Sequence, residues 1–186
     1  MASLTSFLPR IAPTLGLTTS ALYERQRSLV RMKLLPTPEG RGRGSGAEAT
    51  ADTVAALLVS VLATDSLSES EVLVQAIAQS SFIDTAKGIL SICPFTAKDQ
   101  FVDAVACTLA DEKLAKFQPS IIVSRGSHAR IEWRRSRRTE VSLFGSLPEV
   151  NSEFLSREIR LYFPALLAIK NELRASLSHA PIGVEK

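Results

Sequence analysis

Apolar residues between positions 4 and 15 recur at the three- and four-residue intervals that mark one face of a helix. This apolar stripe consists of Leu4, Phe7, Leu8, Ile11, Ala12 and Leu15. Proline has no backbone donor, so Pro9 and Pro13 weaken the pattern. We therefore expect a short amphipathic helix in which Pro9 marks the first turn.

A turn and a second helix follow directly. Gly16 can adopt the positive φ that a tight turn between helices needs, and Thr18 can cap the next helix. Residues 19–35 contain neither Pro nor Gly, which favours a continuous helix. Pro36 then ends it.

Three more helices are predicted before residue 110. Residues 36–49 are a loop rich in Pro and Gly, after which Thr50 caps a helix with Val54, Leu57, Leu58, Val61 and Leu62 on its apolar face. The capping-box spacing at residues 68–71 opens another helix, with Val72, Leu73, Ala76 and Ile77 pointing inward. Residues 84–93 form a short helix or a loop. Thr96 opens a helix with Phe101, Val102, Val105 and Leu109 on one face.

The pattern changes to strands after residue 120. Residues 121–124, 129–134 and 139–144 are predicted as strands, and apolar residues alternate with polar neighbours in the second and third of them, which predicts a hairpin or a three-stranded meander. We expect Ile131, Trp133, Val141 and Leu143 to face inward. Residues 151–177 then predict a long helix, in which Pro164 causes a kink or a break.

The spacing Ala12-x-x-x-Gly16-Leu17-x-x-x-x-Leu22 is that of a helix-turn-helix. A small residue at position 12 lets the two helices approach closely, and Leu17 and Leu22 fill the gap between them. The outward face of the second helix would present hydroxyls, a tyrosine and arginines, which can meet phosphates and base edges in a major groove. We predict the DNA-contacting side chains on this recognition helix to be Thr19, Ser20, Tyr23, Arg27 and Arg31. The alternative is a plain helical hairpin with solvated arginines.

The loop after this helix, with the sequence GRGRGSG over residues 40–46, favours the DNA-binding alternative. Its glycines keep it slim, and Arg41 and Arg43 can reach phosphates or a minor groove, as a wing does. A phosphate-binding P-loop would need a following Lys-Ser/Thr, and a dinucleotide fold would need a preceding strand. Neither is present, so a linker without DNA contacts is the remaining alternative.

Residues 8–63 resemble the N-terminal winged domain of MerR-type regulators and excisionases. The likeness lies in the order A-x-x-x-G-L-T, L-Y-E-R, L-L-P, a Gly/Arg loop and a helix that opens A-T-A-D-T-V. The resemblance implies that the predicted recognition helix and wing contact DNA. Arg25 stands where an apolar residue is expected, and the second helix is longer than is typical. The coiled coil and the cysteine-rich metal loop of MerR proteins are missing, so only DNA binding carries over.

The fold class predicted on these grounds is mainly α with a small β-hairpin or meander. Residues 1–65 would form the winged helix-turn-helix, and residues 66–186 an α+β domain for oligomerisation or effector contacts, ending in the long helix. The apolar seam of that helix has nearly the spacing of a coiled coil. It consists of Leu155, Ile159, Tyr162, Leu166, Ile169, Leu173 and Leu177. It predicts either core packing or a dimer helix, and a dimer would present two recognition helices to a palindromic site.

A second basic site lies between two predicted strands, where four of five consecutive residues are arginines. These are Arg134, Arg135, Arg137 and Arg138. The favoured interpretation is a second phosphate contact that extends the DNA footprint, ahead of an acidic protein partner or an inert charged turn. Trp133 beside them could anchor the base of the hairpin or stack on a partner.

The charge distribution agrees with a polyanion-binding protein. Residues 1–50 hold seven Lys/Arg against three Asp/Glu, residues 51–118 hold four against nine, and residues 119–145 hold six against two. Two cysteines, Cys93 and Cys107, predict free thiols rather than disulfides or a zinc site. We expect no membrane segment, signal peptide, cofactor, metal or catalytic site, and a cytoplasmic, nucleoid-associated protein.

Three functions are compatible with these features. The favoured one is a bacterial or phage transcription regulator that binds a specific sequence in double-stranded DNA as a homodimer. The second is an accessory protein of phage or mobile-element DNA packaging or recombination, which would assemble into larger oligomers. The third is an adapter that uses a winged-helix fold to bind RNA polymerase or another protein.

Overall fold

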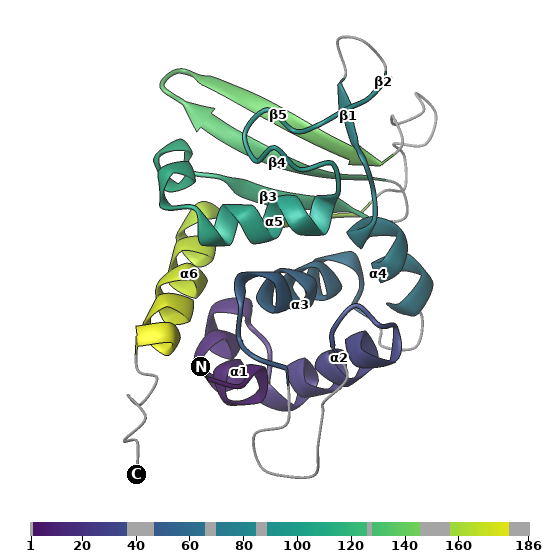
Figure 1. Ribbon diagram of the computed structural model, residues 1–186, viewed down its shortest axis with the longest axis vertical. Helices are drawn as coiled ribbons and strands as arrows, with labels where there is room; N and C mark the ends of the chain where they lie inside the picture. The colour runs from purple at the N-terminus through teal and green to yellow at the C-terminus, as the bar shows by residue number, and fades with distance from the viewer. Residues whose placement is uncertain are drawn as a thin grey trace, which may run out of the picture.

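The computed structural model of the chain describes residues 2–36, 47–65, 70–84, 89–125, 128–145 and 157–178. Within these ranges a layer of helices packs against one face of an antiparallel sheet (Figure 1). This confirms an α+β fold with a C-terminal helix. The helices are α1 (Leu4–Leu15), α2 (Thr19–Arg31), α3 (Ala51–Ala63), α4 (Ser70–Ala78), α5 (Phe101–Ala110), the 3-10 helix η1 (Glu112–Phe117) and α6 (Phe163–Ser178). The strands are β1 (Phe82–Asp84), β2 (Ile89–Leu90), β3 (Ser120–Ser124), β4 (His128–Arg135), β5 (Arg138–Gly145) and β6 (Glu158–Leu161).

The sheet is larger than the small hairpin or meander that was predicted. Its described strands lie in the order β2-β1-β5-β4-β3-β6, and every neighbouring pair is antiparallel. The three predicted strands are confirmed as β3, β4 and β5. The segment predicted as a short helix or loop contains strand β2 and the last residue of β1. Strand β6 lies within the segment predicted as a long helix.

The two faces of the sheet differ sharply in chemistry. Ile131 and Trp133 are fully buried on the face that the helices cover, as predicted. The prediction for β5 is wrong, because Val141 pairs with Glu132 and therefore lies on the outer face, 52% exposed. Ser142 takes the inward position, where its Oγ accepts a hydrogen bond from Nε1 of Trp133 at 2.9 Å. A buried polar pair thus replaces the apolar alternation that the sequence pattern assumed.

Helix α3 is the central helix of the structure. The pattern predicted one apolar face, but α3 is buried on nearly all sides, as helices without a polar face usually are. It packs against α2 and α4 on one side, and against α5 and strands of the sheet on the other. One apolar core consequently runs from α1 to α6. The predicted domain boundary at residue 65 stays a prediction, and core contacts cross it.

Helix α1 begins at Leu4 rather than at Pro9. Ser3 provides the cap, since its hydroxyl accepts a hydrogen bond from the backbone N–H of Ser6 at 3.2 Å. Pro9 and Pro13 both lie inside the helix on its exposed side. The carbonyls that lose a backbone donor there face solvent, so water can replace the missing hydrogen bonds. This is why two prolines are tolerated.

Helix α2 ends at Arg31, four residues before the predicted end. Lys33 adopts a left-handed conformation with φ of 60°. The N–H of Leu34 then bonds the carbonyl of Leu29 at 3.0 Å, and the N–H of Lys33 bonds that of Val30 at 3.1 Å. This pattern of hydrogen bonds is a Schellman motif, which stops the helix before any proline is reached.

Two other helices differ from their predictions in detail. On α4 the inward residues are Val74, Ile77 and Ala78, whereas Val72 is 79% exposed. Helix α5 begins at Phe101 and not at Thr96, which lies in the preceding turn.

The predicted dimer helix is not formed as one helix. Leu155 lies outside the described residues, Ile159 pairs with Val123 in the sheet, and Tyr162 is 61% exposed before α6 begins. Helix α6 starts only at Phe163, with Pro164 in its first turn, where a missing donor costs nothing. The remaining seam residues within the core, Leu166, Ile169 and Leu173, are at most 3% exposed. They therefore pack inside this chain and are not available as a surface seam, and dimerisation itself stays a prediction.

Two residues with a left-handed backbone conformation end α1 and α2. We expect substitutions at these two positions to change the free energy of unfolding in opposite directions. Gly16 has φ of 65°, and a Cβ there meets nothing within 4 Å. Gly16→Ala should therefore lower the free energy of unfolding by about 1 kcal/mol through backbone strain alone. Lys33→Gly should raise it by about 0.5 kcal/mol, because strain relief exceeds the added entropy of the unfolded chain. Urea denaturation of both variants checks this, and shifts of the same sign would contradict it.

Candidate nucleic-acid interface

Helix α2 presents the predicted DNA-contacting residues on its solvent-exposed side. All five of them are exposed: Thr19, Ser20, Tyr23, Arg27 and Arg31. The opposite side of the helix is buried and carries Leu22, Arg25, Gln26, Ser28 and Leu29. The helix is thus fixed to the body by one face and free to be contacted along the other.

The connection between α1 and α2 matches the roles inferred from the helix-turn-helix spacing. Ala12 and Leu22 are buried, and Leu17 is half-buried against the same core. Gly16 and Leu17 end α1 in a Schellman motif, with the N–H of Leu17 bonding the carbonyl of Ala12 at 3.1 Å. The hydroxyl of Thr18 then caps α2 by accepting from the N–H of Ala21 at 3.2 Å.

Arg25 holds α2 to the C-terminal end of α3. Its guanidinium donates to the carbonyl of Ser60 at 2.6 Å and to that of Thr64 at 2.8 Å, and the side chain is 6% exposed. The end of α3 carries carbonyls that lack a helical donor and a partial negative charge, so a buried cation is stabilised there. Burial lowers the pKa of Arg25, and the nearby carboxylate of Asp65 opposes this shift. This explains why an arginine stands where the pattern expects an apolar residue.

The two exposed arginines of α2 form weak surface ion pairs. Arg27 lies 3.4 Å from Glu24 on the same helix, and Arg31 lies 3.6 Å from Glu71 on α4. All four side chains are at least 46% exposed. Exposed pairs of this kind contribute at most about 1 kcal/mol, so a phosphate can displace the carboxylates.

The predicted wing arginines, Arg41 and Arg43, lie outside the described residues. The chain that follows them is fixed beside the start of α1. The N–H of Leu4 bonds the carbonyl of Ala47 at 2.7 Å, and the N–H of Ala49 bonds that of Ala2 at 2.9 Å. The described residues that follow the glycine-arginine sequence therefore lie beside the start of α1.

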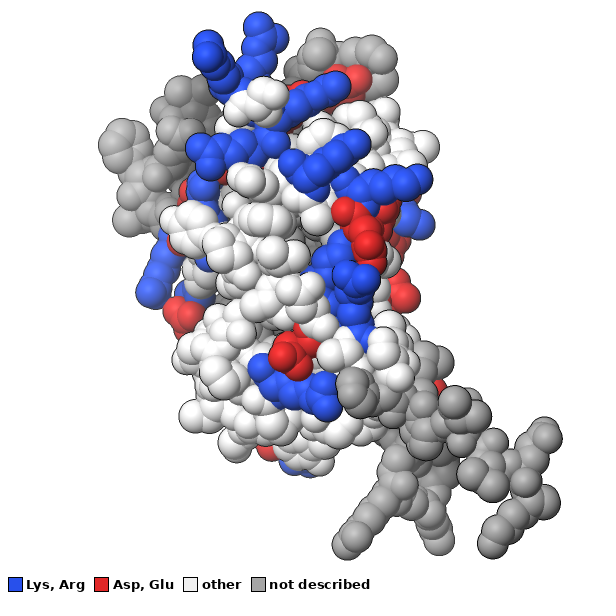
Figure 2. Space-filling view, turned by 90° about the vertical axis from the view of Figure 1, so that its left-hand side faces the viewer, with Lys and Arg blue, Asp and Glu red and all other residues white. Residues whose placement is uncertain are grey.

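The second basic site forms the turn between β4 and β5. Arg135 and Arg138 are the last paired residues of the hairpin, and Arg137 lies in the two-residue turn. All four predicted arginines of this site are exposed. Figure 2 faces the side on which the hairpin turn and η1 lie, and Lys and Arg side chains crowd its upper part. We call Arg134, Arg135, Arg137 and Arg138 the arginine tip.

Trp133 anchors the hairpin below the arginine tip. It is fully buried, and its ring stacks on Phe95 with centroids 4.6 Å apart and an interplanar angle of 11°. Phe95 in turn meets Phe117 of η1 edge to face at 5.4 Å. Of the two roles inferred for Trp133, anchoring the hairpin base is the one its position permits, because a buried ring cannot stack on a partner.

The arginine tip and α2 lie at opposite ends of the molecule. In Figure 1 the hairpin turn is at the upper left, whereas α2 is at the lower right, below α3. The sequence gives no information on this relation. The two basic sites consequently do not form one continuous surface.

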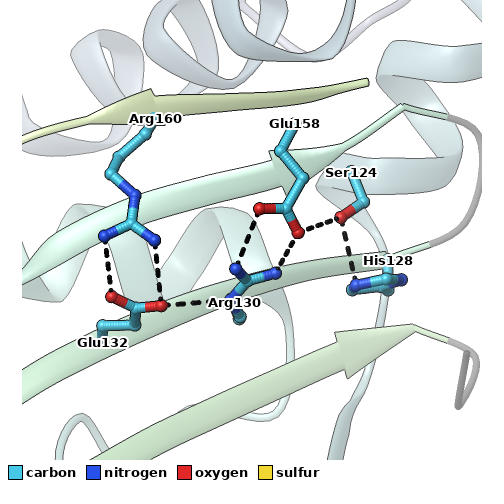
Figure 3. Close-up of polar contacts among 6 residues, drawn as sticks. All are labelled: Ser124, His128, Arg130, Glu132, Glu158 and Arg160. Carbon is cyan, nitrogen blue, oxygen red and sulfur yellow. Dashed lines mark hydrogen bonds and ion pairs between the residues drawn. The ribbon is translucent and has the colours of Figure 1, made fainter. Parts of the chain in front are cut away.

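A network of charged residues crosses the outer face of the sheet from β6 to β4 (Figure 3). Arg160 donates to Glu132 at 3.0 Å and 3.2 Å, and Glu132 also accepts from Nε of Arg130 at 3.3 Å. Arg130 reaches Glu158 with both of its terminal nitrogens. These hydrogen bonds hold the pKa of Glu158 below its ordinary value and raise that of Arg130. Each of these charges is paired across strands, which indicates a structural role.

The same network brings a serine, a histidine and a carboxylate together, which the sequence analysis missed. The hydroxyl of Ser124 donates to Glu158 at 3.1 Å and lies 3.1 Å from Nε2 of His128. A catalytic triad needs the histidine between the serine and the carboxylate so that it can take the serine proton. Here the serine is in the middle, donates its hydrogen bond to the carboxylate and is 0% exposed. This arrangement links strands and does not activate a nucleophile.

The described ranges give no other indication of function. Cys93 and Cys107 are free thiols, and no group of three or more His, Cys, Asp or Glu side chains in these ranges is placed to hold a metal ion. None of the helices in the same ranges combines the length and the apolar character that crossing a bilayer requires. Neither models of protein families, nor curated proteins, nor solved structures give a match to this chain.

Proposed function

We propose that this chain binds double-stranded DNA through α2, as the recognition helix of a winged helix-turn-helix. The observation that carries the proposal is the division of α2 into two faces. One face is held by a capped turn, an apolar core and the hydrogen bonds of Arg25 to α3. The other face is exposed and carries two hydroxyls, a tyrosine and two arginines.

The chemistry of the exposed face suits a major groove. A groove about 12 Å wide admits one helix, and arginine can donate two hydrogen bonds to the edge of a guanine. Thr19 and Ser20 lie in the first turn of α2, where the backbone N–H groups also favour a phosphate. Arg27 and Arg31 follow about two and three turns further along and extend the positive face.

Recognition of a specific sequence for transcription control is the role that we propose for this binding. An accessory role in packaging or recombination would use the same helix but show little sequence preference. An adapter would leave DNA unbound. Capture of genomic fragments by the purified protein separates the three: a recurring motif supports the regulator, binding without a motif favours the accessory role, and no captured DNA favours the adapter.

A double variant of α2 tests the proposal directly. Arg27→Ala combined with Arg31→Ala should weaken DNA binding about tenfold and make the affinity less dependent on salt, because two phosphate or base contacts are lost. Affinities for one duplex are measured by fluorescence anisotropy between about 50 and 200 mM salt.

The matched control is Arg174→Ala, which removes an equally exposed arginine from α6, where it pairs with Glu112 at 2.7 Å. Its affinity should stay within about twofold of the parent, since a single distant surface charge contributes little at these salt concentrations. Equal losses in the α2 variant and the control would contradict the assignment of α2. Absence of binding by the parent protein at the lowest salt would overturn DNA binding altogether.

A further inference from the structure

We propose that the arginine tip is a second DNA-binding element, which enters the groove of a separate duplex, so that one chain bridges two duplexes. The proposal rests on the proposed function for the first duplex, at α2. Its support lies in the unpaired charge of the tip, in its shape and in its position.

The charge of the arginine tip is largely uncompensated. Arg135 lies 3.7 Å from Glu140, with both side chains well exposed. Among the described residues, no carboxylate lies within ion-pairing distance of the other three tip arginines. The contrast with the rest of the sheet is clear, since Arg125, Arg130, Arg157 and Arg160 all pair with carboxylates. Unpaired guanidinium groups are the ones that gain most from a phosphate.

The arginine tip also has the shape of a finger that is charged on both faces. Arg134, opposite Thr139, points to the outer face of the hairpin, while its neighbour Arg135, opposite Arg138, points to the other face. Arg137 stands at the turn, where Ser136 has φ of 53°. Two strands about 5 Å apart fit a major groove about 12 Å wide. Phosphates on both rims of a groove match charges on both faces, whereas an acidic protein surface would meet only one.

The base of the hairpin is rigid and its outer face is open. The stack of Trp133, Phe95 and Phe117 fixes the hairpin to η1. Lys116 on η1 adds a positive charge beside this stack, 5.0 Å from the ring of Phe117. On the outer face, a groove of about 520 Å³ begins at Arg134 and extends to Arg160 and Tyr162. All four arginines of the tip are exposed, so no described element covers them.

The position of the arginine tip requires a second duplex. Because the tip and α2 lie at opposite ends of the molecule, a straight duplex bound along α2 does not reach the tip (Figure 1). Smoothly bending a short duplex by 40–90° costs on the order of 1–6 kcal/mol, which makes one sharply wrapped duplex unfavourable. The extended footprint on one duplex that the sequence suggested is therefore replaced by two separate contacts.

A bridging assay tests this proposal. A short mixed-sequence duplex is fixed to beads, and the capture of a second, fluorescent duplex is measured as protein is added. The parent protein should capture the second duplex. Arg137→Ala combined with Arg138→Ala, at exposed sites, should lower capture about tenfold while affinity for a single duplex stays within about threefold. Arg174→Ala should behave like the parent, and circular dichroism melting checks that all three proteins are folded.

The outcomes separate this proposal from the previous one. If the parent binds one duplex at α2 but captures no second duplex, bridging is wrong. An acidic protein would then be the favoured partner of the arginine tip. If capture persists in the tip variant, two copies of the chain bridge through their α2 helices, which also overturns the proposal. If the parent binds no DNA at all, the proposed function fails first. Loss of capture in the tip variant, with single-duplex binding retained, supports it.

Discussion

Replacing Arg25 by alanine should lower the free energy of unfolding by about 3 kcal/mol, more than a hundredfold in the folding equilibrium. The guanidinium satisfies the carbonyls of Ser60 and Thr64 at the end of α3, and the side chain is 6% exposed. Alanine leaves those carbonyls without a charged donor and opens a gap between α2 and α3. Both consequences act at one buried contact, which is why the effect should exceed that of any surface arginine.

A short series of variants separates the charge from the volume. Arg25→Met keeps most of the volume and removes all donors, so its loss should be about 2 kcal/mol, close to the value of hydrogen bonds to a charged group. Arg25→Lys keeps one charge but cannot reach two carbonyls at once, so its loss should be intermediate between parent and Arg25→Met.

Urea denaturation gives these values, provided that the slope against denaturant is unchanged. The matched control is Arg27→Ala, two residues further along α2, whose arginine is 65% exposed and, within the described ranges, pairs only with Glu24. Its effect should stay within about 0.5 kcal/mol, as is usual for surface substitutions. Equal effects of Arg25→Ala and Arg27→Ala would mean that the contact with α3 is not maintained in solution.

Arg25 also illustrates what a sequence pattern can predict about a helix and what it cannot. The absence of Pro and Gly predicted α2, and the helix-turn-helix spacing predicted its exposed face, because both are local properties of the sequence. Arg25 was a departure from the MerR-type pattern, and its role could not be predicted because the carbonyls that it binds are 35 and 39 residues further along the chain. A buried polar residue is recognised from its partners, and the partners belong to another helix.

The strands were harder to predict for the same physical reason. The hairpin of β4 and β5 is a local structure, and its pattern predicted it. Strand β6 is stabilised by pairing with β3, whose residues lie more than 30 positions earlier. The segment 151–177 contains apolar residues at helical spacing, so its pattern predicts one long helix. Part of this segment instead forms β6, because β3 is available as a pairing partner. Tertiary pairing overrides local pattern in such short strands.

The candidate site likewise has features that depend on local sequence and features that depend on distant parts of the chain. The exposed face of α2 and the arginine tip were both found from the sequence, since exposure and charge are local properties. Their placement at opposite ends of the molecule depends on how α3 and the sheet connect them. The grouping of Ser124, His128 and Glu158 likewise exists only once β3, β4 and β6 are paired. Only the three-dimensional arrangement distinguishes a strand-linking network from a catalytic triad.

Trp133→Ala should lower the free energy of unfolding by about 4 kcal/mol, the usual size for a buried aromatic residue. The ring is 0% exposed, stacks on Phe95 and donates its indole N–H to Ser142, so the variant leaves a cavity under the arginine tip, and the Ser142 hydroxyl keeps only its contact with the thiol of Cys93 at 3.2 Å among the described residues. Circular dichroism follows unfolding, because the fluorescence of the single tryptophan is lost.

A double-mutant cycle then tests whether the indole hydrogen bond itself fixes the base of the hairpin. Ser142→Ala alone should cost about 2 kcal/mol, since it leaves the buried indole N–H of Trp133 without an acceptor. Trp133→Phe alone removes the donor and keeps most of the ring. The combination should cost about 1 kcal/mol less than the sum of the two, because the indole donor and its acceptor are removed together, while the loss of the contact between Ser142 and the Cys93 thiol occurs equally in Ser142→Ala and in the double variant. Strict additivity would show that the hydrogen bond contributes nothing, and the stack on Phe95 would then hold Trp133 at the base of the hairpin without help from Ser142.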